Sequence, residues 1–579
     1  MCIRDRDDTR PVEQWRAQGN NLWLGRVPVS QLPKSLRAPK ASHWVWIISD
    51  NHGSRWVFTE SGAWVSSGSS QRSIVHATRK DDLVTAIETS WGRKITVSYD
   101  GTEVASVTSS DGRCVQYSYD DQGRLVEVNG PGGSRRYEWD NALITTVADA
   151  SDTTECINNY DDRGRISSQQ TANGRTVYFR YLPGGVTAAS DADGANANTW
   201  ICDAYGRTTG VVDAHGGHVS MAYDSFGNMV RCVDRAGNVT SHRYDQRGRL
   251  THTDLPTGGT VDCSWDDADR LVSTTLANGA RTTLDYEAAD RDPVRVTDPC
   301  GGVTCLEWNN GLLLHAMNPV GVSLRFSYDH HGDLVSLENA DGKACHLIRD
   351  DAGRIVKTIS PGGVTTRFGY DDAGHLLSVI TPDGAIWAHR RDAAGRLIEL
   401  VAPDGGSTKW EYRPDGQIAR VIDPLGHVIK HSYDHLGNVA GMQLPDGNVW
   451  GFAHDALSRL IQIVAPDEAR WTYAYDVDGN LSGVNDPAGF ASVFTDGLTT
   501  SIISDGHGHQ LHRIDTDPYG LPTAVTDATG AQQIVTRDLC GRPVEFQNES
   551  GAVTYVERDL AGRIAVSYTH LRAHETVLD

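Results

Sequence analysis

The sequence lacks any apolar run long enough to cross a membrane as a helix. Nowhere in its 579 residues is there an apolar stretch of about 18–20 residues, the length that a bilayer requires. The opening residues MCIRDRDDTR also lack the apolar core that follows the charges of a secretory signal. We therefore predict no membrane span and do not interpret the opening residues as a secretory signal.

Basic residues are in deficit as well. The chain has 53 Lys plus Arg against 75 Asp plus Glu, which gives a net charge of −22 at pH 7. A general nucleic-acid binder needs a basic face, so this balance disfavours nucleic acid as a partner. Phenylalanine is scarce at 9 residues, whereas there are 59 Gly, 15 Trp and 20 Tyr, a composition typical of a chain rich in turns and strands.

Motifs for catalysis and for metal binding are missing too. The chain has neither a G-x-S-x-G nucleophile elbow nor a phosphate-cradling G-x-x-x-x-G-K-[ST] loop. Its 10 cysteines are scattered, and the closest pair, Cys300 and Cys305 in CGGVTC, does not have zinc-knuckle spacing. We therefore predict no enzyme, no catalytic residue, no cofactor and no metal site.

What the sequence does contain is a repeat. At about four times the length of a typical domain, the chain must split into domains or grow by repetition. An aromatic or equivalent residue, taken as position zero, recurs every 21 residues over long runs, which is the signature of a repeat architecture. The positions are Tyr99, Tyr119, Trp139, Tyr160, Tyr181, Cys202, Tyr223, Tyr244, Trp265, Tyr286, Trp308, Tyr328, Arg349, Tyr370, Arg391, Tyr412, Tyr433, His454, Tyr475, Thr516, Arg537 and Arg558.

Each unit has the same internal order, seen around the heptapeptide YDDAGHL at Tyr370–Leu376. A turn, PGG at 361–363, opens the unit; the run VTTRFGY follows and ends on the aromatic; the turn DDAG leads to LLSVI. Two β-prone runs bounded by Gly, Pro and Asp predict two antiparallel strands per unit. In the corner between them we expect Tyr370 to anchor, Asp371 to accept a backbone hydrogen bond, and Gly374 to take a positive φ.

Two departures from this order favour a structural corner over a catalytic signature. At Trp308 the loop is WNNGL, in which Asn310-Gly311 is a strong signal for a two-residue hairpin. The apolar residues Leu397 and Leu400 lie three apart in a predicted strand, which points to a β-bulge.

The recurring Y-D-x-x-G-[RN]-[LIV] in YDDQGRL (119–125), YDDRGRI (160–166) and YDQRGRL (244–250) resembles the YD repeat of the Rhs family. That family includes bacterial polymorphic toxins, wall-associated proteins and the shells of teneurins. The resemblance implies an all-β fold in which a long antiparallel hairpin array spirals into a hollow shell, incomplete here. It also implies a secreted or cell-surface location and a toxin domain held inside.

The period divides the chain into four parts. Residues 1–19 and 566–579 contain MCIRDR and SYTHLRAHET, which break the period and look non-native, like translated adapter sequence, so we set both ends apart from the fold. For residues 1–19 a disordered N-terminal end is the alternative interpretation. Residues 20–95 form a Trp-rich β lead-in that we interpret as degenerate repeats, and residues 96–565 form the repeat array.

Toxin members of the family cleave themselves near a D-P-x-G-L motif, and DPYGL occurs at Asp517–Leu521. Its phase places Asp517 on the repeat Asp and Gly520 on the repeat Gly, and two further units follow. We therefore predict an ordinary corner there and no cleavage.

Other candidate sites are weak. His507, His509 and His512 lack a completing carboxylate or Cys, so we expect a solvated loop there. The calcium-loop echoes at Asp476–Asn480 and Asp191–Asn196 lack a Glu at the twelfth position. Arg354 and Arg396 stand where they can pair with the corner Asp, but we expect such exposed charges to be solvated and worth about 0–1 kcal/mol.

Three functional hypotheses follow, with different partners. The first is a structural shell segment of an Rhs-type polymorphic toxin, which encapsulates a downstream toxin domain for interbacterial competition and meets secretion-machinery proteins. The second is a cell-surface adhesion or carbohydrate-binding repeat protein whose partners are glycans. The third is a β-propeller enzyme, because two units make 42 residues, near the length of a blade.

Overall fold

The computed structural model describes residues 13–16, 22–31, 44–50, 54–69, 74–287 and 292–570. Within these ranges 53 β-strands form one sheet, and the short 3₁₀ helix η1 (Val29–Gln31) is the helical element described. None of the described helices is long and apolar enough to span a membrane. The predicted all-β hairpin array is confirmed.

Five strands come before the regular repeats. The first lies ahead of the Trp-rich segment, and the other four lie within it. They are β1 (Glu13–Arg16), β2 (Leu22–Pro28), β3 (Trp44–Asp50), β4 (Ser54–Phe58) and β5 (Trp64–Ser69).

The first coil of the sheet, as we name residues 75–309, contains the next 23 strands. They are β6 (Val75–Lys80), β7 (Leu83–Thr89), β8 (Lys94–Asp100), β9 (Glu103–Ser109), β10 (Cys114–Tyr119), β11 (Leu125–Gly130), β12 (Gly133–Asp140), β13 (Leu143–Ala148), β14 (Thr154–Tyr160), β15 (Ile166–Thr171), β16 (Thr176–Leu182), β17 (Val186–Ser190), β18 (Asn198–Cys202), β19 (Thr208–Val212), β20 (His218–Tyr223), β21 (Met229–Val233), β22 (Val239–Tyr244), β23 (Leu250–Asp254), β24 (Thr260–Trp265), β25 (Leu271–Leu276), β26 (Arg281–Tyr286), β27 (Pro293–Thr297) and β28 (Val303–Asn309).

The second coil, residues 312–570, contains the remaining 25 strands. They are β29 (Leu312–Met317), β30 (Ser323–Tyr328), β31 (Leu334–Asn339), β32 (Ala344–Arg349), β33 (Ile355–Ile359), β34 (Thr365–Tyr370), β35 (Leu376–Ile380), β36 (Ile386–Arg391), β37 (Leu397–Val401), β38 (Ser407–Tyr412), β39 (Ile418–Ile422), β40 (Val428–Tyr433), β41 (Val439–Gln443), β42 (Val449–His454), β43 (Leu460–Val464), β44 (Arg470–Tyr475), β45 (Leu481–Asn485), β46 (Ala491–Asp496), β47 (Thr500–Asp505), β48 (Gln510–Thr516), β49 (Pro522–Asp527), β50 (Gln532–Arg537), β51 (Pro543–Gln547), β52 (Val553–Arg558) and β53 (Ile564–His570).

Each strand pairs with the strands before and after it in sequence, and the pairings are antiparallel, as between β33, β34 and β35. Two kinds of turn alternate along the array. We call the turn that follows the position-zero residue the YD corner, as at 371–375, and the turn that leads into the next unit the return turn, as at 381–385. A propeller consists of separate four-stranded blades, so the continuous pairing of the described strands shows that the propeller hypothesis was wrong.

The predicted β-bulge is present and sits beside the YD corner. In one unit Gly369 pairs with Ser378 and Tyr370 with Leu376, so Leu377 is the extra residue. In the next unit the pairs Arg390–Glu399 and Arg391–Leu397 leave Ile398 extra. The bulge shifts the alternation of sides by one residue, which explains apolar positions three apart.

The predicted two-residue hairpin at Asn310-Gly311 is confirmed. Asn309 pairs with Leu312, and the two turn residues have φ values of 50° and 76°. Two positive φ values define the type I′ turn, whose twist matches that of the flanking strands. The repeat therefore loses one residue here without a break in the sheet.

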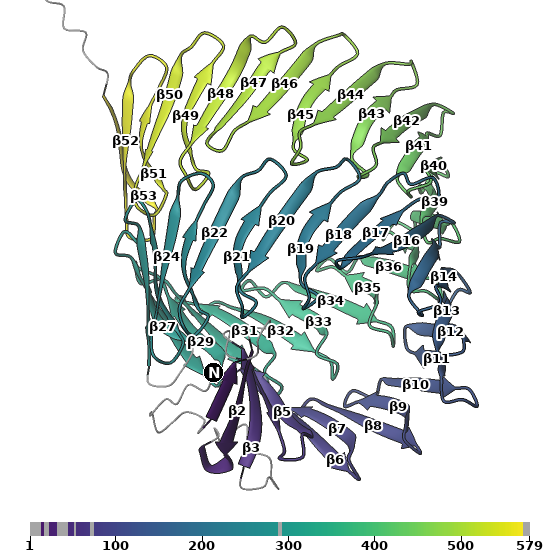
Figure 1. The fold of residues 1–579 in the computed structure, drawn as a ribbon. Helices are drawn as coiled ribbons and strands as arrows, with labels where there is room; N and C mark the ends of the chain where they lie inside the picture. Colours follow the sequence, from purple (N-terminus) through teal and green to yellow (C-terminus); the bar gives the residue numbers. More distant parts are fainter. Residues whose placement is uncertain are drawn as a thin grey trace, which may run out of the picture.

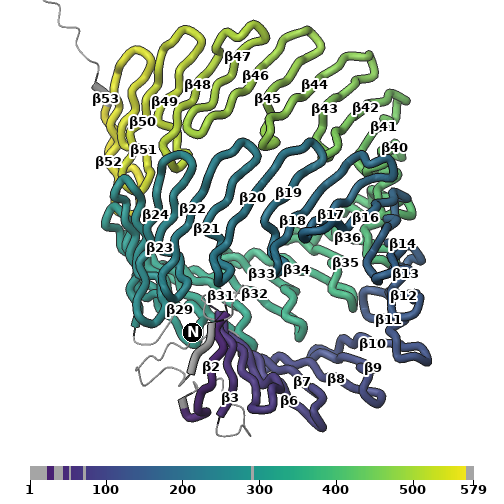
Figure 2. The backbone as a smooth tube through the Cα atoms, in the orientation of Figure 1, coloured from purple at the N-terminus to yellow at the C-terminus, as the bar shows by residue number. Residues whose placement is uncertain are grey.

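The sheet twists and winds into an open coil (Figures 1 and 2). Figure 1 shows the C-terminal strands β45–β53, in green to yellow, running alongside β18–β24. Hydrogen bonds between turns that are 240–261 positions apart confirm that the second coil lies against the first. The predicted spiral is thus confirmed, and the coil is open rather than closed.

Little of the array is buried in a conventional core. The chain exposes 33162 Å², whereas a compact protein of 579 residues exposes about 20,000 Å². The buried hydrophobic cluster lies in and just after the lead-in strands and consists of Val27, Val45, Ile47, Val57 and Ile74, with Val29 packed against it. Elsewhere a single layer must be stabilised within and between its hairpins.

Two described strands extend past the part boundaries expected from the sequence. β1 lies inside residues 1–19, and β53 continues to His570, five positions beyond the expected end of the array at 565. Both pair with a neighbouring strand, β2 and β52 respectively. Backbone hydrogen bonds do not require the side-chain period, so pairing continues where the repeat has ended.

Candidate functional site: the YD corners and the seam between coils

The YD corner around Asp371 closes by backbone and side-chain hydrogen bonds together. The Asp371 N–H donates to the His375 carbonyl and the Gly374 N–H to the Asp371 carbonyl, each at 3.0 Å. The Asp371 carboxylate accepts the His375 N–H at 2.8 Å, and Gly374 has a φ of 93°. The roles expected for Asp371 and Gly374 are confirmed.

The residue at position zero ties each unit to the one before it. The Tyr370 hydroxyl donates to the carbonyl of Ile355, the first residue of β33, at 2.9 Å. Trp265 donates through its indole N–H to the Leu250 carbonyl at 2.7 Å, and Arg349 through Nε to the Leu334 carbonyl at 3.1 Å. Tyr, Trp and Arg are therefore equivalent here because each carries a hydrogen-bond donor at the same reach.

The arginine after the corner glycine is engaged rather than solvated, which corrects our expectation. Arg354 donates through Nε to Asp350 at 2.7 Å and through Nη1 to the Asp371 carbonyl at 2.8 Å. Its guanidinium also lies over the Tyr370 ring, 5.1 Å from the centroid. Arg396 bonds Asp392 and covers Tyr412 in the same way. Ordering one arginine side chain costs conformational entropy once but forms three contacts. These Arg–Asp pairs are therefore stable where an isolated exposed ion pair is not.

These contacts lower the pKa of several corner carboxylates, among them Asp161 and Asp371. For Asp161 the Arg165 guanidinium is the largest cause, and the backbone N–H groups of Arg165 and Arg163 add to it. For Asp371 burial raises the pKa, but hydrogen bonds from the His375 N–H and ring outweigh it, and the net pKa is lowered. The corners are thus built for ionised aspartates.

We predict that Gly374→Val destabilises its corner by about 1–2 kcal/mol, because a β-branched residue is strained at positive φ. Gly374→Asn is the matched control and should cost less. The chain itself places Asp269 (φ 60°) and Ser458 (φ 62°) at this position of other corners. Hydrogen exchange of the Asp371–His375 amides measures the difference, and equal exchange in both variants would refute the assigned role of the backbone angle.

A seam joins the two coils, in which return turns of the first coil meet YD corners of the second. Near its start, Arg93 pairs with Asp333 and donates to the Ala352 carbonyl at 3.2 Å, and the His331 ring bonds the Trp91 carbonyl at 3.0 Å. Further along, the Ala236 N–H donates to the Asp478 carboxylate at 3.0 Å, and His215 lies 3.3 Å from Asp455. Polar groups at corners and turns therefore hold the coils together.

DPYGL at Asp517–Leu521 is one of the corners in this seam. Asp517 accepts the N–H groups of Tyr519 and Leu521, both at 2.9 Å, and Gly520 has a φ of 84°. The Tyr519 hydroxyl donates to the Thr260 carbonyl at 2.9 Å and accepts the Ala277 N–H at 2.7 Å. The motif thus has corner geometry and connects two return turns of the first coil.

Tyr519→Phe should loosen this part of the seam by about 1–2 kcal/mol, because a carbonyl and an amide each lose a partner. The expected result is faster hydrogen exchange at Ala277. Tyr205→Phe is the matched control, since Tyr205 holds the same corner position in the first coil and is 56% exposed. Unchanged exchange in Tyr519→Phe, or an equal change in both variants, would contradict the seam contact.

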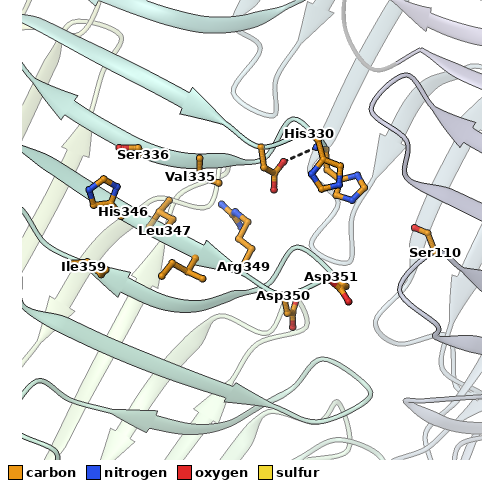
Figure 3. A pocket seen from close by; sticks show the side chains of 13 residues that line it. Ser110, His330, Val335, Ser336, His346, Leu347, Arg349, Asp350, Asp351 and Ile359 are labelled. Atoms are coloured by element: carbon orange, nitrogen blue, oxygen red, sulfur yellow. Dashed lines mark hydrogen bonds between the residues drawn. The ribbon is translucent and has the colours of Figure 1, made fainter.

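Two cavities open along the seam. One, of about 750 Å³, is lined by Asp329, His330, Arg349 and Asp350 of the second coil and by Ser110 of a first-coil return turn (Figure 3). Two of its polar groups are already committed: Arg349 bonds a carbonyl, and Asp329 accepts the His331 N–H at 2.8 Å. The other, of about 800 Å³, is lined by residues that include Asp298, Tyr519, Cys540 and Arg542.

The remaining sequence candidates do not converge on one point. His509 bonds Asp505 at 2.9 Å, whereas His512 lies on β48 and pairs with Asp527. The Asp476 carboxylate caps the Asn480 N–H at 2.8 Å. At the other calcium-loop echo, Asp191 pairs with Arg175 at 2.9 Å.

Sequence reasoning missed the grouping of Cys300 with Cys540, because it considered only cysteines that are close in sequence. Cys305 lies on β28 and is not part of the described three-residue group that could hold a metal ion, which consists of Asp298, Cys300 and Cys540. The sequence did carry a signal for the bond between neighbouring units, because Tyr, Trp and Arg at position zero each have a side-chain hydrogen-bond donor.

Comparisons with known proteins agree with this fold. A family model for the teneurin YD-shell matches residues 323–453, and one for the RHS repeat matches residues 99–135, 265–303 and 454–491. No curated protein sequence matches the chain. The fold thus defines a class of protein in which hairpin repeats form a single-layered sheet, and this sheet is coiled on itself. The matched segments are similar to the RHS repeat and to the teneurin YD-shell, which agrees with the predicted resemblance to the Rhs and YD-repeat family.

The solved structures that the chain matches share little sequence with it. The chain is 15% identical to one in the Tc holotoxin pore of Photorhabdus luminescens, with a TM-score of 0.46, over 96% of this chain and 32% of that chain. It is 13% identical to one in the TcdB2–TccC3 crystal structure, with a TM-score of 0.44, over 92% of this chain and 39% of that chain. The chain therefore spans about a third of the length of these proteins.

Proposed function

We propose that this chain is a wall segment of a toxin shell, and that the whole protein encloses a toxin domain encoded downstream for delivery in interbacterial competition. The seam is the observation that carries this proposal. YD corners of the second coil contact return turns of the first coil, so the two coils form a continuous wall.

The use of the polar side chains supports a structural role without catalysis. Corner aspartates accept backbone N–H groups, corner arginines cover aromatic rings, and seam histidines bond carbonyls or carboxylates. These groups are ordered by the wall itself. Their chemistry is that of hydrogen-bonded turns.

The sequence of the gene downstream of residue 565 tests the proposal first. We expect it to continue into the rest of the shell and to end in a domain unrelated to the repeats. Further repeats followed by neither would contradict the proposal.

Protease treatment of the complete gene product tests enclosure itself. We expect the C-terminal domain to resist digestion when it is joined to the shell and to be digested when it is expressed alone. Equal digestion in both contexts would contradict enclosure. Competition between bacteria with and without the intact gene then tests delivery, and binding on a glycan array would instead favour the adhesion hypothesis.

A further inference from the structure

Two cysteines meet across the seam although they are 240 positions apart in the sequence. Cys300 lies in the return turn Asp298–Gly302 between β27 and β28, and Cys540 lies in the YD corner between β50 and β51. The ligand atoms of Asp298, Cys300 and Cys540 all lie within 4.8 Å of one another, and both thiols are free. Figure 1 shows β50 and β51 along the same side of the coil as β27.

The backbone around these cysteines is held close on both sides. A Cβ on Gly302 would meet the Leu560 carbonyl at 2.7 Å, so the return turn also packs against the next YD corner. Asp298 accepts the N–H groups of Cys300 at 2.9 Å and of Gly302 at 2.8 Å, and Asp538 accepts the Cys540 N–H at 2.9 Å. Two turns that are each capped in this way present their thiols in a defined geometry.

We propose that Cys300 and Cys540 form a disulfide that fastens the second coil to the first. An S–S bond is about 2.05 Å long, so the sulfurs must approach by at most about 2.8 Å, a distance within the reach of side-chain rotation. The bond is a modification site of the wall, beyond the proposed role of the chain as a shell segment.

A metal ion fits the same group less well. The Asp298 carboxylate already caps its turn, three ligands leave a tetrahedral site incomplete, and the Arg542 guanidinium contacts both Asp538 and Cys300. A positive charge beside the thiols opposes a cation but not a neutral disulfide.

The oxidant is a low-molecular-weight disulfide such as oxidised glutathione. The Cys300 thiolate attacks it, forms a mixed disulfide and releases one glutathione thiolate. The Cys540 thiolate then attacks the Cys300 sulfur and releases the second, so two protein thiols are oxidised and one glutathione disulfide is reduced. The two thiol protons pass to solvent and then to the released glutathione.

The second cavity opens beside the pair, because Cys540 and Pro299, the residue before Cys300, line it. Burial, and then contact with the Cys300 side chain, raise the pKa of the Cys540 thiol to about 12. The second step is therefore favoured by mildly alkaline buffer, and the test is best run at about pH 8.5.

The experiment treats the folded chain with oxidised glutathione and maps its peptides by mass spectrometry without reduction. We expect a linked pair of peptides that contain Cys300 and Cys540, and the loss of two free thiols per chain. Because Cys305 shares a tryptic peptide with Cys300, Cys305→Ser is the matched control and should keep the link, whereas Cys300→Ser and Cys540→Ser should lose it.

The fold must be the source of the selectivity. Oxidation in concentrated urea should therefore scatter the links over other cysteines. Three results would each overturn the proposal. The first is glutathione attached to both cysteines without a link, and the second is a dominant link to another cysteine in the folded chain. The third is one zinc ion bound per chain that blocks oxidation when the chain is incubated with zinc.

Discussion

At pH 2.5 we expect the midpoint of thermal unfolding to fall by about 10 °C or more relative to pH 7, with little change between pH 7 and pH 5. The corner carboxylates are the cause. Hydrogen bonds and arginines lower the pKa of many of them, among them Asp245, Asp266, Asp350, Asp371, Asp434, Asp455 and Asp538.

The sign follows from the direction of these shifts. A carboxylate whose pKa is lower in the folded state contributes stability above the pKa of the unfolded chain, near 3.9, and that stability is lost as the pH falls through the folded value. The pKa of the return-turn Asp505 is lowered to about 2, first by its bond to the His509 ring. The loss should therefore occur between about pH 4 and pH 2.

Repulsion between positive charges also grows at low pH, so a salt control is needed. In about 0.5 M NaCl, long-range repulsion is screened, whereas the short hydrogen bonds of the corners depend less on salt. We expect most of the decrease to persist. A midpoint that stays constant from pH 7 to pH 2.5, or a decrease abolished by salt, would contradict the role of the corner aspartates.

Tyr370→Ala should destabilise the hairpins around it by about 2–3 kcal/mol, the largest effect we expect from one substitution in the array. It removes the bond to the Ile355 carbonyl, the contact with the Arg354 guanidinium and the buried part of the ring. Tyr370→Phe removes only the hydroxyl and should cost about 1 kcal/mol.

Tyr370→Arg is the control that separates a donor from an aromatic ring. Arg349 already bonds the equivalent carbonyl at position zero of the preceding unit, so we expect Tyr370→Arg to cost less than Tyr370→Ala. Hydrogen exchange of β33–β35 reads the local opening free energy of each variant. If Arg is as damaging as Ala, or Phe as damaging as Ala, the donor role of position zero is wrong.

Much of one unit could be predicted from the sequence, because its structure is local. The Asp and Gly of YDDAGHL set their corner through hydrogen bonds between residues three and four positions apart. The spacing of Leu397 and Leu400 indicated the β-bulge, and the dipeptide Asn310-Gly311 predicted the two-residue hairpin turn. The engaged Arg354 was missed because its third partner, the Tyr370 ring, belongs to the next unit.

The seam could not be predicted in the same way. A 21-residue period says that units repeat, but the number of units per coil depends on the small twist added by each hairpin. Which return turn meets Tyr519, or that Cys300 meets Cys540, follows only from the accumulated twist. Sequence could place both residues in turns, and it could not place those turns together.

A cryo-electron microscopy reconstruction of this chain that resolves individual strands tests the account most directly. We predict one coiled sheet in which the corner at Asp517–Leu521 rests on the return turns at 255–259 and 276–280. A closed ring of separate blades around an axial channel, or an extended sheet whose two coils do not touch, would contradict it.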